Sequence, residues 1–223
     1  DNGTAPLPGT GGGTRSPYDA PAATAQYGSS VVSGGEVVYA GFWKRYAAYF
    51  LDSILVAIVN VPVSLVLNGI GAASGDPTVG VIMYLIAMLA GFAIGVGYYA
   101  WFHSSRGGAT LGKMAVGIKV VRSDGERLTF MRAFGRYWGF VLSSLTLLIG
   151  FIMAAFTERK QALHDMLCDT VVVDKWAFTE NSQYQEHGLG TVTIIILVLN
   201  GIFVVAGIGL MIAMIGVIGA SMS

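Results

Sequence analysis

The chain has 223 residues, of which 54% are hydrophobic and only 12% are charged, and its formal net charge is zero. A soluble domain normally carries about 25% charged residues, so this composition, with its apolar residues clustered into long runs, indicates a membrane protein. The balanced charge, with no long basic tract, also argues against a nucleic-acid partner. Cys168 is the single cysteine, so the sequence offers neither an internal disulfide nor a Cys-only metal site.

Residues 1–39 consist mostly of Gly, Pro, Ala, Ser and Thr. This composition is typical of a flexible linker or tail, and the segment lacks the apolar stretch of a signal peptide. Linkers of this kind often join two folded pieces. We therefore expect a tail at 1–39, with a soluble domain upstream of it.

The first membrane segment is expected at about 46–70, directly after an aromatic and basic stretch that includes Trp43 and Arg45. One acid, Asp52, lies inside the apolar run. An ionised carboxylate in a membrane helix costs about 2.5–3.5 kcal/mol unless it is paired or hydrated, so Asp52 needs a partner. Arg45 precedes it by almost two helical turns, which places both side chains on one helix face, roughly 10 Å apart along the axis.

Polar residues continue along this helix beside Asp52, at positions Ser53, Asn60, Ser64 and Asn68. Two interpretations stay open. These side chains either form hydrogen bonds where helices pack together, or line a hydrated path that reaches Asp52. We favour helix packing.

The second membrane segment is expected at about 78–102, after a short loop at 71–77. Gly91 and Gly95 within it have the spacing that lets two helices approach closely. Residues 103–136 contain seven Lys or Arg side chains, whereas the 71–77 loop contains none. The positive-inside rule then places the N-terminus and the 103–136 loop in the cytoplasm.

Within that loop, residues 107–113 (GGATLGK) superficially suggest a phosphate-binding loop. Met114 follows, where the phosphate-binding pattern needs Ser or Thr, and no strand precedes the glycines, so we reject a nucleotide site. A turn followed by an amphipathic piece at the membrane surface fits better. The next residues, 118–130, predict a short hairpin that turns at Asp124 and Gly125.

The third apolar segment, at about 137–156, has two basic residues before it and two after it: Arg132, Arg136, Arg159 and Lys160. A simple span would place one of these pairs outside, against the positive-inside rule. We favour a re-entrant or bent hairpin around 143–150, which keeps both pairs inside. A backbone break at membrane depth is tolerated only where protein or water covers it.

Two short elements and a last membrane helix follow. Residues 163–167 fit a short helix with one apolar side, and 170–173 (TVVV) fit an extended piece. Residues 176–188 read as a linker, and 189–223 as an additional, uncharged C-terminal transmembrane helix. The whole sequence predicts an all-α integral membrane protein with three to four membrane helices, one of them a re-entrant or bent hairpin, and an amphipathic cytoplasmic loop.

Three sequence blocks occur in order: FWKRYAAYFLDSIL at 42–55, TLGKMAVGIKVVRSDGERLTFMRAFGR at 110–136 and ERKQALHDMLCDTVVVD at 158–174. Together they resemble the RDD family of bacterial membrane proteins over about residues 40–175. The family is named for an arginine and two aspartates, which the resemblance assigns to Arg45, Asp52 and Asp165. Asp169 departs from the family, which commonly has a small residue such as glycine there. Some members resemble cation/proton antiporters, which makes ion transport an expectation by analogy.

The residues of the motif predict one site. We expect Asp165 to pack against Arg45 near the cytoplasmic end of the first span, with Asp52 deeper. One arginine facing two carboxylates would leave a net negative charge, so a buried acid could exchange a proton for a monovalent cation. His164 is either a proton relay or an interfacial hydrogen-bonding group. The alternative is a structural network in which Arg45 clamps both acids.

Two further combinations are weaker. His164 and Cys168, four residues apart, could face a metal ion or form a nucleophile pair, and Asp165 with Asp169 could hold a divalent cation. The sequence has no second cysteine and no other histidine close by. We therefore expect no enzymatic activity, no cofactor and no resident metal.

The sequence thus predicts a small bacterial inner-membrane protein that transports a monovalent cation or protons through Arg45, Asp52, Asp165 and His164. The alternative is a non-transporting accessory or scaffold subunit, whose glycine-rich last helix packs against other membrane proteins. The expected partners are the lipid bilayer, a monovalent cation or proton, and either further copies of this chain or other membrane subunits.

Overall fold

The computed structural model describes residues 36–145 and 149–221, so the tail predicted at 1–39 lies almost wholly outside the described residues. The described chain is mostly helical, which confirms the predicted all-α membrane class. Within the described ranges, three helices are long and apolar enough to cross a membrane: α1 (Phe42–Ala73), α2 (Pro77–Ser104) and α7 (Thr191–Ser221).

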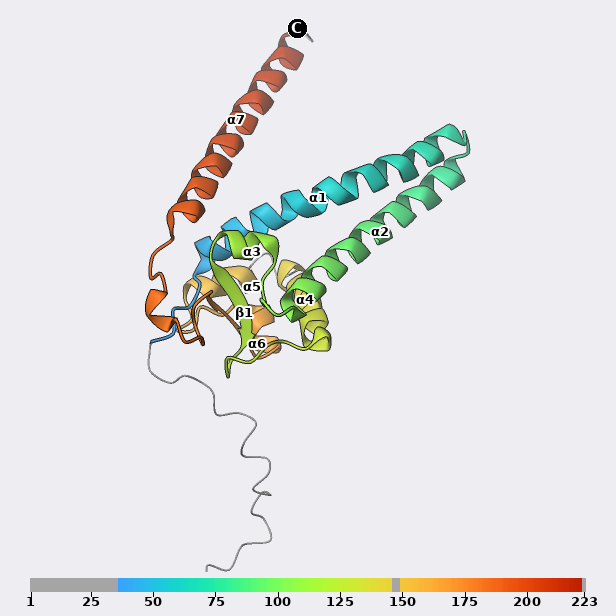
Figure 1. Ribbon diagram of the computed structural model, residues 1–223. Helices are drawn as coiled ribbons and strands as arrows, with labels where there is room; N and C mark the ends of the chain where they lie inside the picture. Colours follow the sequence, from blue (N-terminus) through green and yellow to red (C-terminus); the bar gives the residue numbers. More distant parts are fainter. Residues whose placement is uncertain (1–35, 146–148, 222–223) are drawn as a thin grey trace, which may run out of the picture. The chain divides into compact units, whose positions relative to one another are not determined.

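Helices α1 and α2 form an antiparallel pair joined by a short turn (Figure 1). The Asp76 side chain caps α2 by accepting a 2.7 Å hydrogen bond from the Thr78 amide. The two helices pack closely at Gly91, where an added Cβ would lie 2.7 Å from the Asn60 side-chain nitrogen. Asn60 therefore packs against α2, whereas Ser53 and Asn68 donate to the backbone of their own helix.

A small antiparallel sheet lies beyond the ends of these helices. It pairs β1 (Ile118–Arg122) with β2 (Thr170–Asp174), and Ile118 faces Asp174 across the ladder. The hairpin predicted at 118–130 is wrong: a turn does follow β1, but the strand that pairs with β1 comes from the distant block that follows α6 (Leu163–Leu167). Glu126 and Arg127, directly after the turn, are exposed, whereas every residue of β2 is buried. Strand β1 thus pairs with the buried strand β2 and not with the exposed residues that follow the turn.

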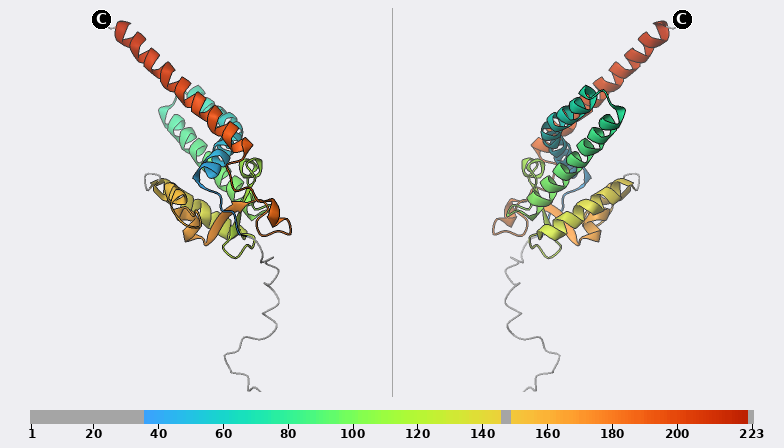
Figure 2. Two further views of the ribbon diagram at one scale, coloured as in Figure 1. Left: turned by 90° about the vertical axis from the view of Figure 1, so that its left-hand side faces the viewer. Right: turned by 90° about the vertical axis from the view of Figure 1, so that its right-hand side faces the viewer.

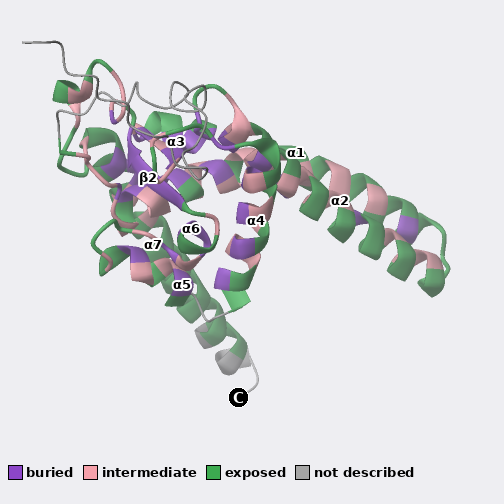
Figure 3. Cartoon of the chain, turned by 90° about the horizontal axis from the view of Figure 1, so that it is seen from below, coloured by how far each residue is buried: buried purple, intermediate pink, exposed green. Residues whose placement is uncertain are grey.

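Apart from Leu128, the core beside the sheet consists of small and β-branched residues: Ala40, Ala47, Ala48, Val116, Ile118, Val120, Ala133 and Val172. Alanine on α1 is what allows the short helix α3 (Leu111–Ala115) to sit directly against it. Burial differs between the two ends of the fold. Figure 3 shows buried residues gathered around α3, β2, α4 and α6, and exposed residues along the far parts of α1 and α2. The polar residues described below lie in this buried end.

The third apolar segment is bent. Helix α4 (Phe130–Leu145) is followed by α5 (Ile149–Ile152) and the 3-10 turn η2 (Met153–Ala155), and the two parts are inclined by 115° (Figure 2). Residues 146–148, at the break, lie outside the described residues. A Cβ on Gly150 would lie 2.9 Å from Ser143, so the two parts pack together. The bend predicted around 143–150 is present, and α4 begins earlier than the expected 137.

Helix α7 follows a segment that contains the 3-10 turn η3 (Ser182–Tyr184). It contacts the rest of the fold through its first turns, where Thr193 and Ile196 are buried. The Tyr46 hydroxyl on α1 donates a 2.8 Å hydrogen bond to Asn200. Beyond Asn200, the side chains of α7 that the structure describes are all exposed.

Candidate functional site

Asp165 is the centre of a charged cluster where α1, α4 and α6 meet. Its side chain is fully buried, and it forms ion pairs with Arg45, at 2.5 Å, and with Arg136. The Ala162 amide donates a third hydrogen bond, 2.9 Å long, to the same carboxylate. The predicted contact between Arg45 and Asp165 is therefore present, and a second arginine completes the cluster.

Arg45 also ties the start of α1 to two backbone segments. Its Nε donates to the Ala40 carbonyl oxygen at 2.8 Å, and its Nη2 donates to the Lys160 carbonyl oxygen at 2.5 Å. Together with the bond to Asp165, these bonds use all three nitrogens of the guanidinium group. Arg45 thus joins the chain before α1, the segment before α6 and α6 itself.

Arg136 was not among the predicted site residues. It lies on the buried face of α4, where Ala133, Arg136, Gly139 and Ser143 recur at helical spacing. The sequence did contain a signal for a buried arginine, because Arg136 lies on the small-residue face of an amphipathic helix. A basic residue at the end of an apolar segment is, however, also typical of a residue that flanks a membrane span at the surface. Among the described residues, its Nη1 atom has no hydrogen-bond partner.

The pKa values in this cluster favour a fixed ion pair. Burial raises the pKa of Asp165, but Arg136 and Arg45 outweigh it and hold that pKa well below its usual range. Burial lowers the pKa of His164 to about 3, so its ring is neutral at pH 7. The His164 Nδ1 lies 3.4 Å from the Ser143 hydroxyl. A neutral ring in this position fits a hydrogen-bonding group better than a proton relay.

Asp52 lies in a second, separate cluster. Its side chain is fully buried and accepts three hydrogen bonds from neutral groups: the Tyr98 hydroxyl at 2.7 Å, the Thr110 hydroxyl at 2.6 Å and the Gly112 amide at 2.8 Å. The first comes from α2, and the other two come from the start of α3. The partner that Asp52 requires is thus a set of uncharged donors.

The expected single network of Arg45 with both acids is wrong. Among the described residues, no hydrogen bond or ion pair joins Arg45 to Asp52. The reason is geometric: about two helical turns separate the two side chains, and Arg45 is already occupied by Asp165 and two carbonyl oxygens. The turn before α3 reaches Asp52 instead.

Gly112 makes this approach possible. A Cβ at this position would overlap the Ala48 carbonyl oxygen and would lie 2.8 Å from Asp52 Oδ1. Thr110 has a double role, because its hydroxyl donates to Asp52 and also caps α3 by accepting from the Lys113 amide. The TLGK sequence therefore builds a close contact between α3 and α1.

Lys113 adds a third cation to the region. It is buried, and its ammonium lies 5.7 Å from the centre of the Tyr99 ring. Burial lowers its pKa to about 8, although Asp52 favours the charged form. Three basic side chains, Arg45, Arg136 and Lys113, thus accompany the two buried acids. The net negative charge expected from one arginine and two acids is wrong.

The other candidates stay apart. Cys168 and His164 share no hydrogen bond among the described residues, and burial raises the pKa of the Cys168 thiol. Asp169 is exposed, bonds the Ser123 hydroxyl and has a φ of 50°, a left-handed conformation that glycine adopts easily. This explains why a small residue suits the position. Within the described ranges, no three His, Cys, Asp or Glu side chains are placed to hold a metal ion.

The described part of the chain is that of a helical integral membrane protein. It has three apolar helices, a bent fourth segment, and buried polar residues gathered at one end. The sequence model of the RDD family matches residues 39–169, more than half of the chain. This protein belongs to the RDD family. The match includes Arg45, Asp52 and Asp165.

Three Bacillus subtilis (strain 168) proteins are similar to this chain. It is 38% identical to the uncharacterized protein YxaI over 148 residues, which is 61% of this chain and 97% of the relative. It is 34% identical to the uncharacterized membrane protein YteJ over 60% of this chain and 80% of the relative. It is 28% identical to the uncharacterized protein YckC over 60% of this chain and 83% of the relative. No solved structure matches the chain.

Proposed function

We propose that this protein is a non-transporting accessory or scaffold subunit that packs against other proteins in a bacterial inner membrane. The observation that supports this most is the state of Asp52. It is fully buried and already accepts three hydrogen bonds from its own chain. An exchangeable ion site needs access to water and free coordinating oxygens, whereas this carboxylate is fully buried and both of its oxygens already accept hydrogen bonds. Its chemistry suits holding α3 against α1.

The surface of α7 supports the same proposal. After its contact with Tyr46 the helix carries only exposed apolar and small side chains in its described part. At Gly201, Gly207 and Gly209, no atom of the described chain would lie within 4 Å of an added Cβ. Small residues on a membrane helix let a second helix approach closely. Another membrane protein or a second copy of this chain would fit this face.

The orientation follows from charge. Residues 103–136, from the end of α2 into α4, contain seven Lys or Arg side chains, and the turn between α1 and α2 contains none. By the positive-inside rule, the start of α1 and the sheet face the cytoplasm. We infer no enzymatic role, because His164 is neutral and separate from Cys168.

Proton-coupled transport of a monovalent cation is the second candidate. One observation favours it: Lys113 is buried near Asp52, and its pKa of about 8 lies close to physiological pH. Protonation of this amine could be coupled to the state of Asp52. In this version Lys113 carries the proton, and Asp52 compensates its charge.

Two measurements separate the candidates. Proteoliposomes loaded with a pH-sensitive dye receive a sodium or potassium pulse, with wild type, Asp52→Asn and Lys113→Met compared. The accessory role predicts the same slow leak in all three. A cation-dependent proton flux that either substitution abolishes, while the protein stays folded, contradicts it.

The second measurement looks for the partner. A photo-crosslinking residue replaces Ile212 on α7 in native membranes, and the same residue replaces Leu65 on α1 as a lipid-facing control; both positions are more than half exposed. The accessory role predicts a discrete protein adduct from position 212 that Gly209→Leu removes. An adduct at twice the chain mass identifies a second copy as the partner. Equal, diffuse labelling at both positions contradicts the proposal.

A further inference from the structure

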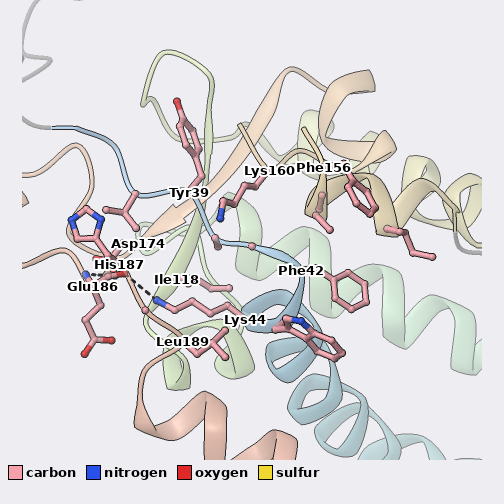
Figure 4. Close-up of a pocket in the computed structure, with 18 residues that line it drawn as sticks. Tyr39, Phe42, Lys44, Ile118, Phe156, Lys160, Asp174, Glu186, His187 and Leu189 are labelled. Carbon is pink, nitrogen blue, oxygen red and sulfur yellow. Dashed lines mark hydrogen bonds between the residues drawn. The ribbon is translucent and has the colours of Figure 1, made fainter. Parts of the chain in front are cut away.

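A cavity of about 650 Å³ opens beside the first turn of α1 (Figure 4). Its lining comes from six parts of the chain: the residues before and at the start of α1, strand β1, the end of the bent segment, the segment before α6, strand β2, and the residues before α7. Neither Asp52 nor Asp165 lines it. The cavity is therefore separate from the two buried carboxylates, although Arg45, which pairs with Asp165, donates to the carbonyl oxygens of two lining residues, Ala40 and Lys160.

Two lysines line this cavity, and no carboxylate pairs with either of them among the described residues. Lys44 is only 5% exposed, and its ammonium has one long hydrogen bond, 3.3 Å, to the Glu186 carbonyl oxygen. Lys160 reaches across the start of α1, where its Nζ lies 3.6 Å from the position of a Cβ on Gly41. Burying an ammonium with so few partners is costly, which indicates that an anion is the missing partner.

The first turn of α1 adds further donors. Gly41 precedes the helix and offers no side-chain cap, and the first bond within the helix runs from the Arg45 amide to the Gly41 carbonyl oxygen. The amides of residues 42–44 therefore have no acceptor within the helix. They lie at the positive end of a long helix dipole, which favours a bound anion.

The two acids of the lining are turned to other partners. Both carboxylate oxygens of Asp174 accept backbone amides, from Trp176 at 2.9 Å and from Glu186 at 3.3 Å. The Glu186 carboxylate lies against Gly190, where an added Cβ would be 2.9 Å from its oxygen. Among the described residues, neither acid therefore forms an ion pair with Lys44 or Lys160.

The remaining walls are apolar. Phe42, Trp43, Ile152, Phe156 and Leu189 line the cavity, and Trp43 and Phe156 are more than half exposed. Exposed aromatic residues at the start of a membrane helix mark the depth of the lipid headgroups. A ligand here would meet cations and free amides on one side and apolar surface on the other.

We propose that this cavity binds an anionic phospholipid of the surrounding membrane. The lipid phosphate lies against the first turn of α1, between Lys44 and Lys160, and the glycerol and upper acyl chain follow Phe156 and Trp43. Basic pockets between membrane segments are known to hold anionic headgroups in this manner. This inference stands independently of whether the chain has a protein partner.

The test uses the full chain purified in a mild detergent, titrated with short-chain phosphatidylglycerol, short-chain phosphatidylcholine or inorganic phosphate, with the melting temperature as readout. Only phosphatidylglycerol should raise the melting temperature of the wild type. Lys160→Gln should weaken its apparent affinity about fivefold, and Lys44→Gln with Lys160→Gln on the order of 25-fold, given the usual contribution of one lysine at a lipid surface. Arg159→Gln, which removes a neighbouring exposed cation outside the lining, should leave the affinity unchanged.

Three results overturn the proposal. Equal loss of affinity in Arg159→Gln and Lys160→Gln would show attraction by general surface charge alone. Equal stabilisation by phosphatidylcholine would remove the requirement for an anion. Equal stabilisation by inorganic phosphate would make the site one for free anions. If the double variant does not fold, Lys160→Gln against Arg159→Gln decides alone, because both side chains are exposed.

Discussion

Asp165 and Asp52 are both fully buried acids of the RDD motif, and their partners differ in charge. Asp165 is held by two guanidinium groups, whereas Asp52 is held by two hydroxyls and one backbone amide. When one partner of a buried ion pair is removed, the other charge stays buried without compensation. A carboxylate bound by neutral donors can be replaced by its amide at much smaller cost. The two acids should therefore respond differently to the same substitution.

Asp165→Asn should have the largest effect. The amide leaves Arg45 and Arg136 buried without a countercharge, so the free energy of unfolding should fall by about 3–5 kcal/mol. The measurement is reversible unfolding in mixed micelles of detergent and sodium dodecyl sulfate. Asp169→Asn is the matched control, because its exposed carboxylate is 3.5 Å from Arg132, and it should cost less than about 1 kcal/mol. Equal losses in both variants would contradict the assignment.

Gly112→Ala tests the contact that brings α3 to Asp52. The added methyl group would overlap the Ala48 carbonyl oxygen, so the unfolding free energy should fall by about 3 kcal/mol, near the upper end for overpacking. Gly107→Ala is the control, since no atom lies within 4 Å of its added Cβ. Similar stability of the two variants would show that α3 does not pack as described.

Acidification should destabilise the protein through His164. Its pKa is about 3 in the fold and near 6.5 in the unfolded chain, so the unfolded chain binds the extra proton between these values. Stability is fully present above pH 6.5 and declines as pH falls, by about 2 kcal/mol at pH 5. The lowered pKa of Asp165 adds a further loss in stronger acid. His164→Gln should reduce the slope between pH 6.5 and 5, and an unchanged slope would exclude His164 as a source of it.

Asp52→Asn should have the smallest effect, about 1 kcal/mol. The remaining carbonyl oxygen can still accept from Tyr98 and Gly112, and the new amide can donate to the Thr110 hydroxyl oxygen. Ser53→Ala, next to it on α1, removes a hydroxyl that bonds only its own helix, and should be nearly neutral. A loss as large as that of Asp165→Asn would mean that the charge on Asp52 is paired.

Much of this arrangement follows from local patterns. The lengths and apolar character of α1, α2 and α7 predicted the spans within a few residues, and matching basic ends predicted a bend in the third segment. The contact between Arg45 and Asp165 came from the resemblance to the RDD family together with the requirement that buried charges pair. The spans and the bend depend on composition over short windows, which the sequence displays directly.

The features that were missed are non-local. Strand β1 pairs with residues 170–174 because those residues are buried, and a period-two pattern is the same for a near and a distant partner. Thr110 and Gly112 belong to a segment that matched no ligand-binding pattern, and neutral donors leave no signature comparable to that of a charge. Arg136 was interpreted as a basic flank, although its face of α4 is buried.

The most direct test of two separate clusters is a pair of double-mutant cycles on the unfolding free energy. Arg45→Met is combined with Asp165→Asn in one cycle and with Asp52→Asn in the other. The structure predicts a coupling of about 2–3 kcal/mol for Arg45 with Asp165 and no more than about 0.5 kcal/mol for Arg45 with Asp52. Comparable coupling in both cycles would contradict it, and would place all three residues in one network.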